Sequence, residues 1–154
     1  TAFMRGRGEI VTLLPPLPQM WVVLVLPDVP RPPEKTKQLY GSLKASHYTD
    51  GGITRKMAIK LKEGAGLPTD LLFNVFEKVA FNVFAGLNVY RERMVEAGAA
   101  NVHLAGSGPT LFTLFKDKTP AEELYRRLKE QKIECYLAET FTPDEIQGYG
   151  NINQ

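Results

Sequence analysis

The stretch Val102-His-Leu-Ala-Gly-Ser-Gly-Pro-Thr-Leu-Phe-Thr-Leu-Phe115 places two short apolar runs on either side of a glycine-containing turn. Residues 102–105 and 110–115 are therefore predicted to form two β-strands. The residues between them, Gly106-Ser-Gly-Pro109, are typical of a sharp turn, because glycine adopts backbone angles that other residues disfavour. This strand–turn–strand unit is the middle of the predicted fold.

The segments upstream of this unit predict a strand followed by helices. Residues 21–26 are apolar and largely β-branched, which indicates a strand covered on both faces or nearly so. Shorter helices are expected over residues 36–44 and 53–63. Apolar residues at steps of three and four over residues 69–97 predict one long amphipathic helix, in which Gly86 marks a bend or a close contact.

Downstream of the turn, we expect a helix beginning near Thr119 and a last strand over residues 133–141. The resulting order is β-α-β-β-α-β, with additional helices before the long one. This order predicts an α+β fold of the ferredoxin-like sandwich type, in which a four-stranded antiparallel sheet carries helices on one face. The inward side of the last helix should consist of Ala121, Leu124 and Leu128.

The composition excludes several classes of protein. Nineteen basic and 17 acidic residues give a net charge of +2, which is too balanced to indicate nucleic acid or an anionic membrane as a partner. A single cysteine, Cys135, excludes an internal disulfide and a cysteine-based zinc cluster. Apolar runs are far shorter than the ~20 residues that span a bilayer, and the first residues lack a signal-peptide core, so we expect a cytoplasmic protein.

The glycine turn is the first candidate for chemistry. Two glycines one residue apart, Gly106 and Gly108, allow backbone N–H groups to point at an anion, and phosphate is the usual guest of such a turn. However, no Gly-Lys-Ser/Thr sequence follows, so this is not a Walker A loop. Taken alone, a turn that joins two strands is the better interpretation.

The surrounding sequence adds a family resemblance. Leu104-Ala-Gly-Ser-Gly-Pro-Thr-Leu-Phe112 resembles the third motif of the GHMP kinases. Thr1-Ala-Phe-Met-Arg-Gly-Arg-Gly-Glu9 is similar to the stretch after that family's catalytic aspartate loop. Residues 21–27, followed by Lys35-Thr-Lys-Gln-Leu-Tyr40, resemble its strand, proline and Thr-x-x-x-aromatic element, and Asn74-Val-Phe-Glu77 resembles its Asn-x-x-Glu helix start. Within the superfamily, the segments are most similar to kinases that phosphorylate 4-diphosphocytidyl-2-C-methyl-D-erythritol in the non-mevalonate route to isoprenoids.

The resemblance implies roles for five residues. Gly106, Ser107 and Gly108 correspond to a loop that supports the phosphate region of the active site. Tyr40 stands where the family places an aromatic ring that stacks on cytosine, and a tyrosine face can stack on any base. Thr36 either contacts substrate or caps its helix, and the residue type favours the cap. A packing role for Tyr40 is the alternative.

Five other polar or reactive residues are expected to have structural roles. Asn74 and Glu77 should make local capping contacts. His47 and His103 have no carboxylate partner at a telling spacing, and His103 in a strand should be a satisfied packing residue. Cys135, also in a strand, should be a buried and inert thiol.

The resemblance also implies what this chain does not contain. Nothing matches the family's Pro-x-x-x-Gly-Leu-Gly-Ser-Ser phosphate loop, and the family's catalytic aspartate and N-terminal lysine precede the position of Thr1. We therefore expect no catalytic residue and no metal ligand here. The expected organisation is a single C-terminal domain over residues 1–154, with residues 1–14 as a remnant of a preceding N-terminal domain and residues 142–154 as a polar tail.

The expected partners follow from that organisation. The whole kinase would use ATP and Mg²⁺, act on a cytidine diphosphate-linked polyol and place that substrate against the N-terminal domain. This chain alone should be inactive and bind neither cofactor. An apolar patch near Phe3, Ile10 and the glycine turn should cause self-association. The alternatives are another GHMP kinase, of the homoserine or mevalonate type, and a non-catalytic ferredoxin-like ligand-binding or dimerisation domain.

Overall fold

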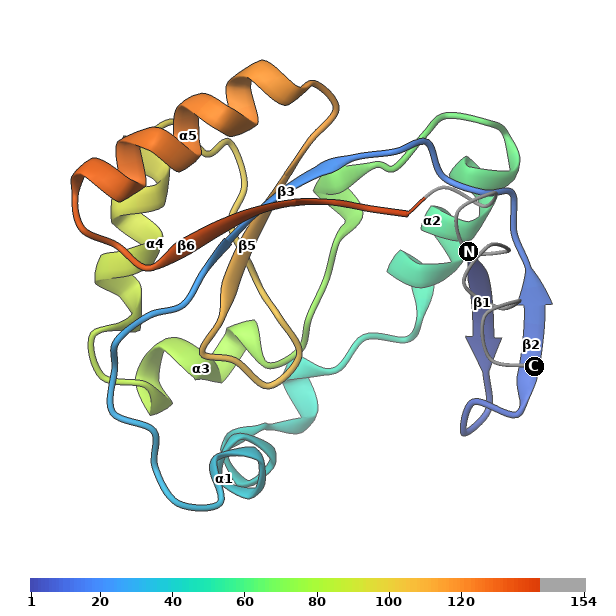
Figure 1. Cartoon of the computed structure of the whole chain (residues 1–154). Helices are drawn as coiled ribbons and strands as arrows, with labels where there is room; N and C mark the ends of the chain where they lie inside the picture. The colour runs from blue at the N-terminus through green and yellow to red at the C-terminus, as the bar shows by residue number, and fades with distance from the viewer. Residues whose placement is uncertain (142–154) are drawn as a thin grey trace, which may run out of the picture.

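A four-stranded antiparallel sheet in the order β4-β5-β3-β6 forms the centre of the computed structural model, which describes residues 1–141 (Figure 1). Taken in chain order, its strands follow the ferredoxin-like arrangement, so the predicted fold class is confirmed. The polar tail expected over residues 142–154 lies outside the described residues. The strands are Trp21–Val25 (β3), His103–Leu104 (β4), Leu111–Phe115 (β5) and Cys135–Glu139 (β6).

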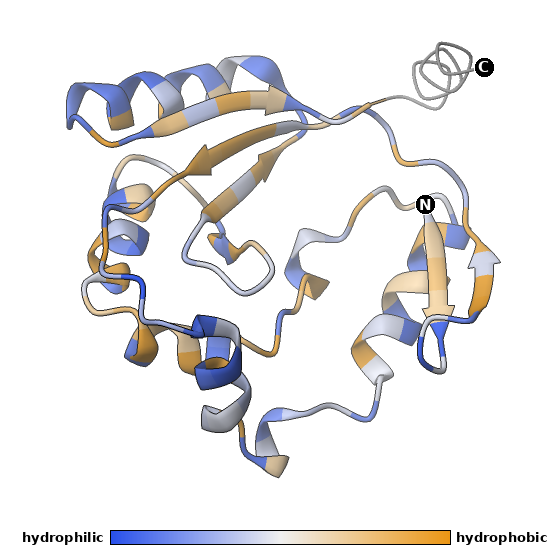
Figure 2. Ribbon diagram, turned by 60° about the horizontal axis from the view of Figure 1, so that its bottom comes forward, coloured by the Kyte–Doolittle hydropathy of each residue, from blue (hydrophilic) through white to orange (hydrophobic). Residues whose placement is uncertain are grey.

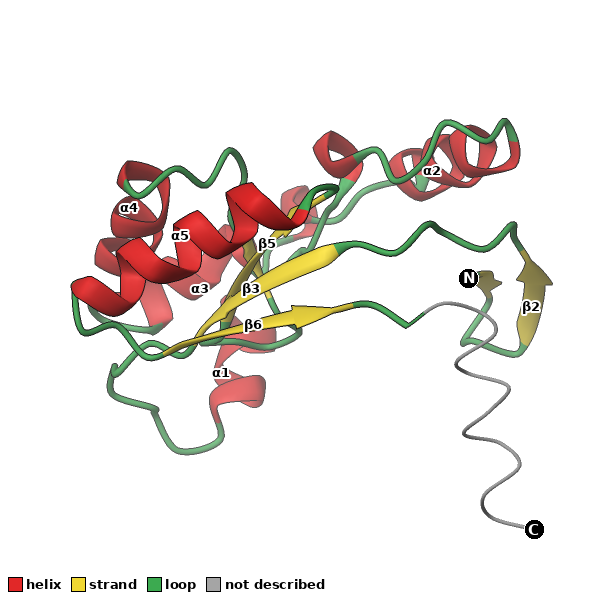
Figure 3. Cartoon of the chain, turned by 45° about the horizontal axis from the view of Figure 1, so that its top comes forward, coloured by secondary structure: helices red, strands yellow, loops and turns green. Residues whose placement is uncertain are grey.

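Three helices cover one face of this sheet (Figure 3): Glu77–Val83 (α3), Leu87–Glu96 (α4) and Lys118–Glu130 (α5). Strand residues of one register row lie beneath them, because side chains alternate between the two faces of a sheet. Val25 pairs with Leu111 on one side and Cys135 on the other, and all three are fully buried. The buried residues of α5 are Ala121, Leu124 and Leu128, as the sequence predicted.

The prediction of one helix over residues 69–97 is wrong. The chain forms a short 3₁₀ turn, Thr69–Leu71 (η2), then an irregular segment, and then the separate helices α3 and α4. Phe84 is extended after α3, and Gly86 precedes α4 with a φ of 86°. Phe84 and Leu87 are nevertheless both fully buried in one core. The spacing of apolar residues therefore predicted correctly which side of the segment is buried. It did not predict that the helix is interrupted.

The remaining elements lie around this core. Helix α1 (Lys35–Ser42) packs against α3, and a 3₁₀ turn, Ala45–His47 (η1), follows it. Helix α2 (Gly52–Lys62) lies away from the sheet (Figures 1 and 3). Both helices agree with the predicted ranges. Within the described residues, no helix has the length and apolarity that crossing a membrane requires.

The first residues form a separate two-stranded hairpin of Ala2–Arg5 (β1) and Ile10–Leu13 (β2). Figures 1 and 2 show it at one end of the molecule, apart from the β4–β5 turn. The apolar patch expected to join the hairpin to the glycine turn is therefore divided, and Phe3 is partly buried. The exposed apolar side chains of the hairpin are Met4, Ile10, Val11 and Leu13.

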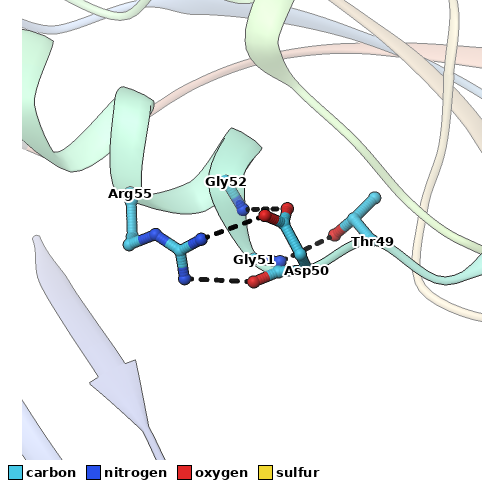
Figure 4. A network of polar contacts seen from close by, with 5 residues as sticks. All are labelled: Thr49, Asp50, Gly51, Gly52 and Arg55. Carbon is cyan, nitrogen blue, oxygen red and sulfur yellow. Dashed lines mark hydrogen bonds and ion pairs between the residues drawn. The ribbon is translucent and has the colours of Figure 1, made fainter.

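A local polar network fixes the start of α2 (Figure 4). The Asp50 carboxylate accepts a 2.8 Å hydrogen bond from the Gly52 N–H and lies 3.3 Å from the Arg55 guanidinium. Arg55 also donates to the Asp50 carbonyl oxygen at 3.0 Å, and the Gly51 N–H donates to the Thr49 hydroxyl at 3.3 Å. These groups are exposed, so the network stabilises a helix end and contributes little energy beyond that.

Candidate functional site

The turn between β4 and β5 has the tight geometry that its glycines predicted. Gly106 and Gly108 have φ angles of 54° and 63°, in the left-handed region that favours glycine. The Ala105 N–H donates to the Thr110 carbonyl oxygen at 2.9 Å, and the Gly108 N–H donates to the Ala105 carbonyl oxygen at 2.9 Å. A Cβ atom added at Gly108 would lie 2.7 Å from Leu104 Cδ1, so this position also needs a residue without a side chain.

Side chains from elsewhere occupy the carbonyl oxygens of this turn. Asn74 Nδ2 donates to the Leu104 and Gly106 carbonyl oxygens at 3.0 and 2.7 Å. Lys35 Nζ donates to the Gly108 carbonyl oxygen. By contrast, the N–H groups of Gly106 and Ser107 make no hydrogen bond within residues 1–141. The turn therefore presents two free donors, while side chains occupy the carbonyl oxygens of Leu104, Gly106 and Gly108, and free N–H donors are what an anion requires.

Asn74 and Glu77 act over a longer range than the sequence suggested. The expected local contact exists, since Asn74 Oδ1 accepts a 3.0 Å hydrogen bond from the Phe76 N–H. However, Glu77 Oε1 accepts a 2.9 Å hydrogen bond from the Leu104 N–H on β4 and makes no cap. The Asn-x-x-Glu segment thus holds β4 and the turn that follows it. These contacts join residues that lie 27 to 32 positions apart in the sequence. Local capping rules cannot predict contacts at such a separation, so only the resemblance of the Asn-x-x-Glu segment to a family motif pointed to a role in the site.

Helix α1 carries the other two predicted site residues, Thr36 and Tyr40, and Thr36 contacts the turn. Thr36 Oγ1 donates a 3.3 Å hydrogen bond to Ser107 Oγ. The expected helix cap at Thr36 is wrong, because Glu34 is the residue at the helix start and no side chain caps it. Tyr40 is 59% exposed, and its ring meets Phe76 edge to face with centroids 5.0 Å apart. The structure therefore brings Thr36, Ser107 and the glycines together, with Tyr40 one helical turn further along.

A groove of about 650 Å³ opens beside the turn. Gly106 and Ser107 form one part of its wall, and four aromatic rings form another part. The rings that line it belong to Phe73, Phe76, His103 and Phe112. The site thus combines a turn with free N–H donors, an exposed aromatic ring and an adjoining groove with aromatic walls.

The two histidines and the cysteine lie in different surroundings. His103 Nδ1 is 3.6 Å from Glu77 Oε1, but Nε2 is the one buried side-chain polar atom in residues 1–141 without a hydrogen-bond partner. His103 is a packing residue, as expected. The expectation that both of its ring nitrogens have hydrogen-bond partners is wrong. His47 Nδ1 accepts from the Lys44 N–H at 3.1 Å. Cys135 is fully buried as predicted, and this burial raises the pKa of its thiol.

Comparison with known proteins gives this geometry a context. Residues 57–134 match the family described as "GHMP kinases C terminal". A 4-diphosphocytidyl-2-C-methyl-D-erythritol kinase from Dehalococcoides mccartyi is 48% identical over 143 residues, which cover 93% of this chain and 50% of the relative. The same kinase from Enterococcus faecalis is 35% identical, over 91% of this chain and 48% of the relative. The chain therefore spans about half the length of the curated relatives it matches.

Two solved structures have the same fold. A crystal structure of a 4-(cytidine 5'-diphospho)-2C-methyl-D-erythritol kinase aligns with a TM-score of 0.66 and 25% identity, over 90% of this chain and 48% of that one. A homoserine kinase from Cytophaga hutchinsonii aligns with a TM-score of 0.63 and 16% identity, over 92% and 48% of the two chains. At that identity, the homoserine kinase shows the fold alone.

Proposed function

This chain belongs to the C-terminal family of the GHMP kinases, and we propose that it forms the substrate-side half of an ATP-dependent kinase that phosphorylates 4-diphosphocytidyl-2-C-methyl-D-erythritol. The activity for which the relatives from Dehalococcoides mccartyi and Enterococcus faecalis are named supports this choice of substrate. Such a kinase belongs to non-mevalonate isoprenoid biosynthesis and to the cytoplasm. Residues 1–14, which form the hairpin apart from the sheet, would belong to the preceding domain.

The observation that carries the proposal is the contact between Thr36 and Ser107, which sets α1 against the glycine turn. Residues four apart on a helix lie on the same side, so Tyr40 stands about 5–6 Å along α1 from Thr36. One side of the Tyr40 ring meets Phe76, and the ring is largely open to solvent. A cytosine base can therefore stack on Tyr40 while the attached diphosphate extends toward Ser107.

The remaining parts of the site position the phosphate region. The free N–H groups of Gly106 and Ser107 bind phosphate oxygens without a side chain in the way. Asn74 and Glu77 hold β4 and the turn so that these groups keep their direction. Preorganised donors of this kind contribute to catalysis because they need no rearrangement when charge develops. We assign no catalytic residue to this chain.

The phosphoryl group would come from ATP. Phosphoryl transfer needs the neutralisation of phosphate charge, which Mg²⁺ usually provides. Within the described part of the chain, no cluster of three or more histidine, cysteine or acidic side chains could hold a metal ion. We derive no step through the metal from this chain.

Titration with CDP tests the substrate assignment on this chain directly. We expect the NMR signals of Tyr40 and of the Gly106 and Ser107 amides to shift together. Tyr40→Ala should weaken binding by about 5- to 150-fold, since stacking on one base contributes roughly 1–3 kcal/mol, while Tyr40→Phe keeps the ring. Tyr48→Ala is the matched control, because Tyr48 is similarly exposed at 56%. Tyr40 signals that ignore CDP would favour a GHMP kinase with another acceptor.

A turnover assay tests the proposal that the catalytic groups lie outside this chain. The purified chain with ATP, Mg²⁺ and the cytidine-linked substrate should release no ADP. Measurable turnover would overturn the view that the catalytic groups lie outside this chain. The non-catalytic alternative, a ferredoxin-like regulatory domain, would instead show a symmetric dimer that binds a metabolite tightly, and sedimentation with and without CDP distinguishes it.

A further inference from the structure

Lys35 is the one charged side chain that hydrogen-bonds the turn of residues 105–109, among the residues that the structure describes. Its Nζ donates to the Gly108 carbonyl oxygen. The next residue, Thr36, donates to Ser107 Oγ at 3.3 Å. Two consecutive residues of α1 therefore contact two consecutive residues of the turn.

The charge of Lys35 is not neutralised by a carboxylate. The neighbouring acidic residue, Glu34, forms its ion pair with Lys37 at 2.8 Å, and Lys35 has no ion pair in residues 1–141. Lys35 is also partly buried, and charges attract more strongly where less water surrounds them. A charge-assisted bond to a phosphate oxygen is roughly twice as strong as a neutral one, so an anion can draw the ammonium away from the carbonyl of Gly108.

The uncharged groups around Lys35 fit the same ligand. The Gly106 and Ser107 N–H groups are free, and the Thr36 hydroxyl donates to the Ser107 hydroxyl of the same turn. Uncharged donors orient a phosphate but do not balance its charge, whereas Lys35 can. We propose that Lys35 is a phosphate-binding residue of this site and that it contacts the diphosphate of the nucleotide-linked substrate. This inference rests on the proposed function and adds a residue to which the family resemblance gave no role.

A lysine-reactivity measurement on the unmodified chain tests the proposal without any risk of misfolding. The chain is treated briefly with acetic anhydride, with and without saturating pyrophosphate, and each lysine is quantified by mass spectrometry. We expect pyrophosphate to protect Lys35 several-fold. Lys37, which is exposed and two residues away, and Lys44 serve as internal controls that should not change.

Matched variants give the size of the effect. Lys35→Gln should weaken pyrophosphate binding by about 10- to 150-fold, because it removes a charge-assisted hydrogen bond. Lys37→Gln should bind as the unmodified chain does. Glutamine can still donate to the Gly108 carbonyl, so circular dichroism and amide exchange of the turn should remain unchanged in Lys35→Gln.

The outcomes separate this proposal from the proposed function. If pyrophosphate shifts the Gly106 and Ser107 amides but neither protects Lys35 nor binds Lys35→Gln more weakly, Lys35 only ties α1 to the turn. That result would overturn this inference and leave the proposed function intact. If pyrophosphate at high concentration moves neither amide and protects no lysine, the turn is not an anion site, and both proposals lose their phosphate contact.

Discussion

The side-chain amide of Asn74 donates a 2.7 Å hydrogen bond to the carbonyl oxygen of Gly106, which lies 32 positions later in the chain. The same nitrogen also reaches the Leu104 carbonyl oxygen at 3.0 Å. Asn74 Oδ1 also accepts a hydrogen bond from the Phe76 N–H, just before α3. The start of α3 therefore fixes the direction of the glycine turn. The shape of the candidate site is therefore set by a residue that lies outside the glycine motif.

Removing this contact should loosen the turn. Asn74→Ala is expected to cost about 1–3 kcal/mol of unfolding free energy, because two turn carbonyls and one N–H lose their partner. Asn74→Asp should cost at least as much, since a carboxylate would face two carbonyl oxygens. Urea denaturation and hydrogen exchange at Gly106 and Ser107 measure both effects. Asn82→Ala, an exposed position on α3, should change stability by less than about 0.5 kcal/mol. Equal stability of Asn74→Ala and the unmodified chain would contradict the role given to Asn74.

The two glycines of the turn should respond differently to alanine. Both adopt left-handed angles, so each substitution costs about 1–2 kcal/mol in backbone strain. Only at Gly108 does the new Cβ meet other atoms, at 2.7 Å from Leu104 Cδ1 and 3.3 Å from Phe84 Cε2, while nothing lies within 4 Å at Gly106. Gly108→Ala should therefore lose about 1–3 kcal/mol more than Gly106→Ala in denaturant titrations. Equal losses would show that Leu104 moves aside freely.

Phe84 should be among the most sensitive core positions. It is fully buried at the break between α3 and α4, so Phe84→Ala should lower the unfolding free energy by about 3–5 kcal/mol. Phe73 is 41% exposed in the groove, and Phe73→Ala should cost less than about 1.5 kcal/mol. Thermal and chemical denaturation of the Phe84→Ala and Phe73→Ala variants compare the two losses of unfolding free energy. A similar loss at both positions would place Phe73 in the core as well.

Cys135 should be unreactive until the chain unfolds. Burial raises the pKa of its thiol, and nearby Lys129 opposes this only in part. At pH 8, modification by a disulfide reagent should be at least about a hundredfold slower than in urea, because it requires opening of the core. A group with a raised pKa in the folded state stabilises that state below its unfolded pKa. This contribution should be lost from about pH 9 upward as the unfolded thiol ionises. Rapid labelling of the folded chain would refute the buried assignment.

Part of the fold could be predicted from local patterns. The strand at residues 21–25, the turn at residues 106–109 and the inward side of α5 follow from apolar period and glycine content, which act over a few residues. The long helix was mispredicted because Phe84 and Leu87 continue the apolar period across a break that Gly86 allows. Periodicity reports which side of a segment is buried, and it does not report where the chain changes direction.

The sequence by itself determined the order β-α-β-β-α-β, the glycine turn and the resemblance to the GHMP kinases. The tertiary structure alone decided which side chains surround that turn. Thr36 proved to contact Ser107 where a helix cap was expected, and Asn74 and Lys35 proved to occupy the carbonyl oxygens of Gly106 and Gly108. These contacts join residues 32 to 73 positions apart, and they form because packing α1 and α3 beside β4 brings the donors within hydrogen-bond distance.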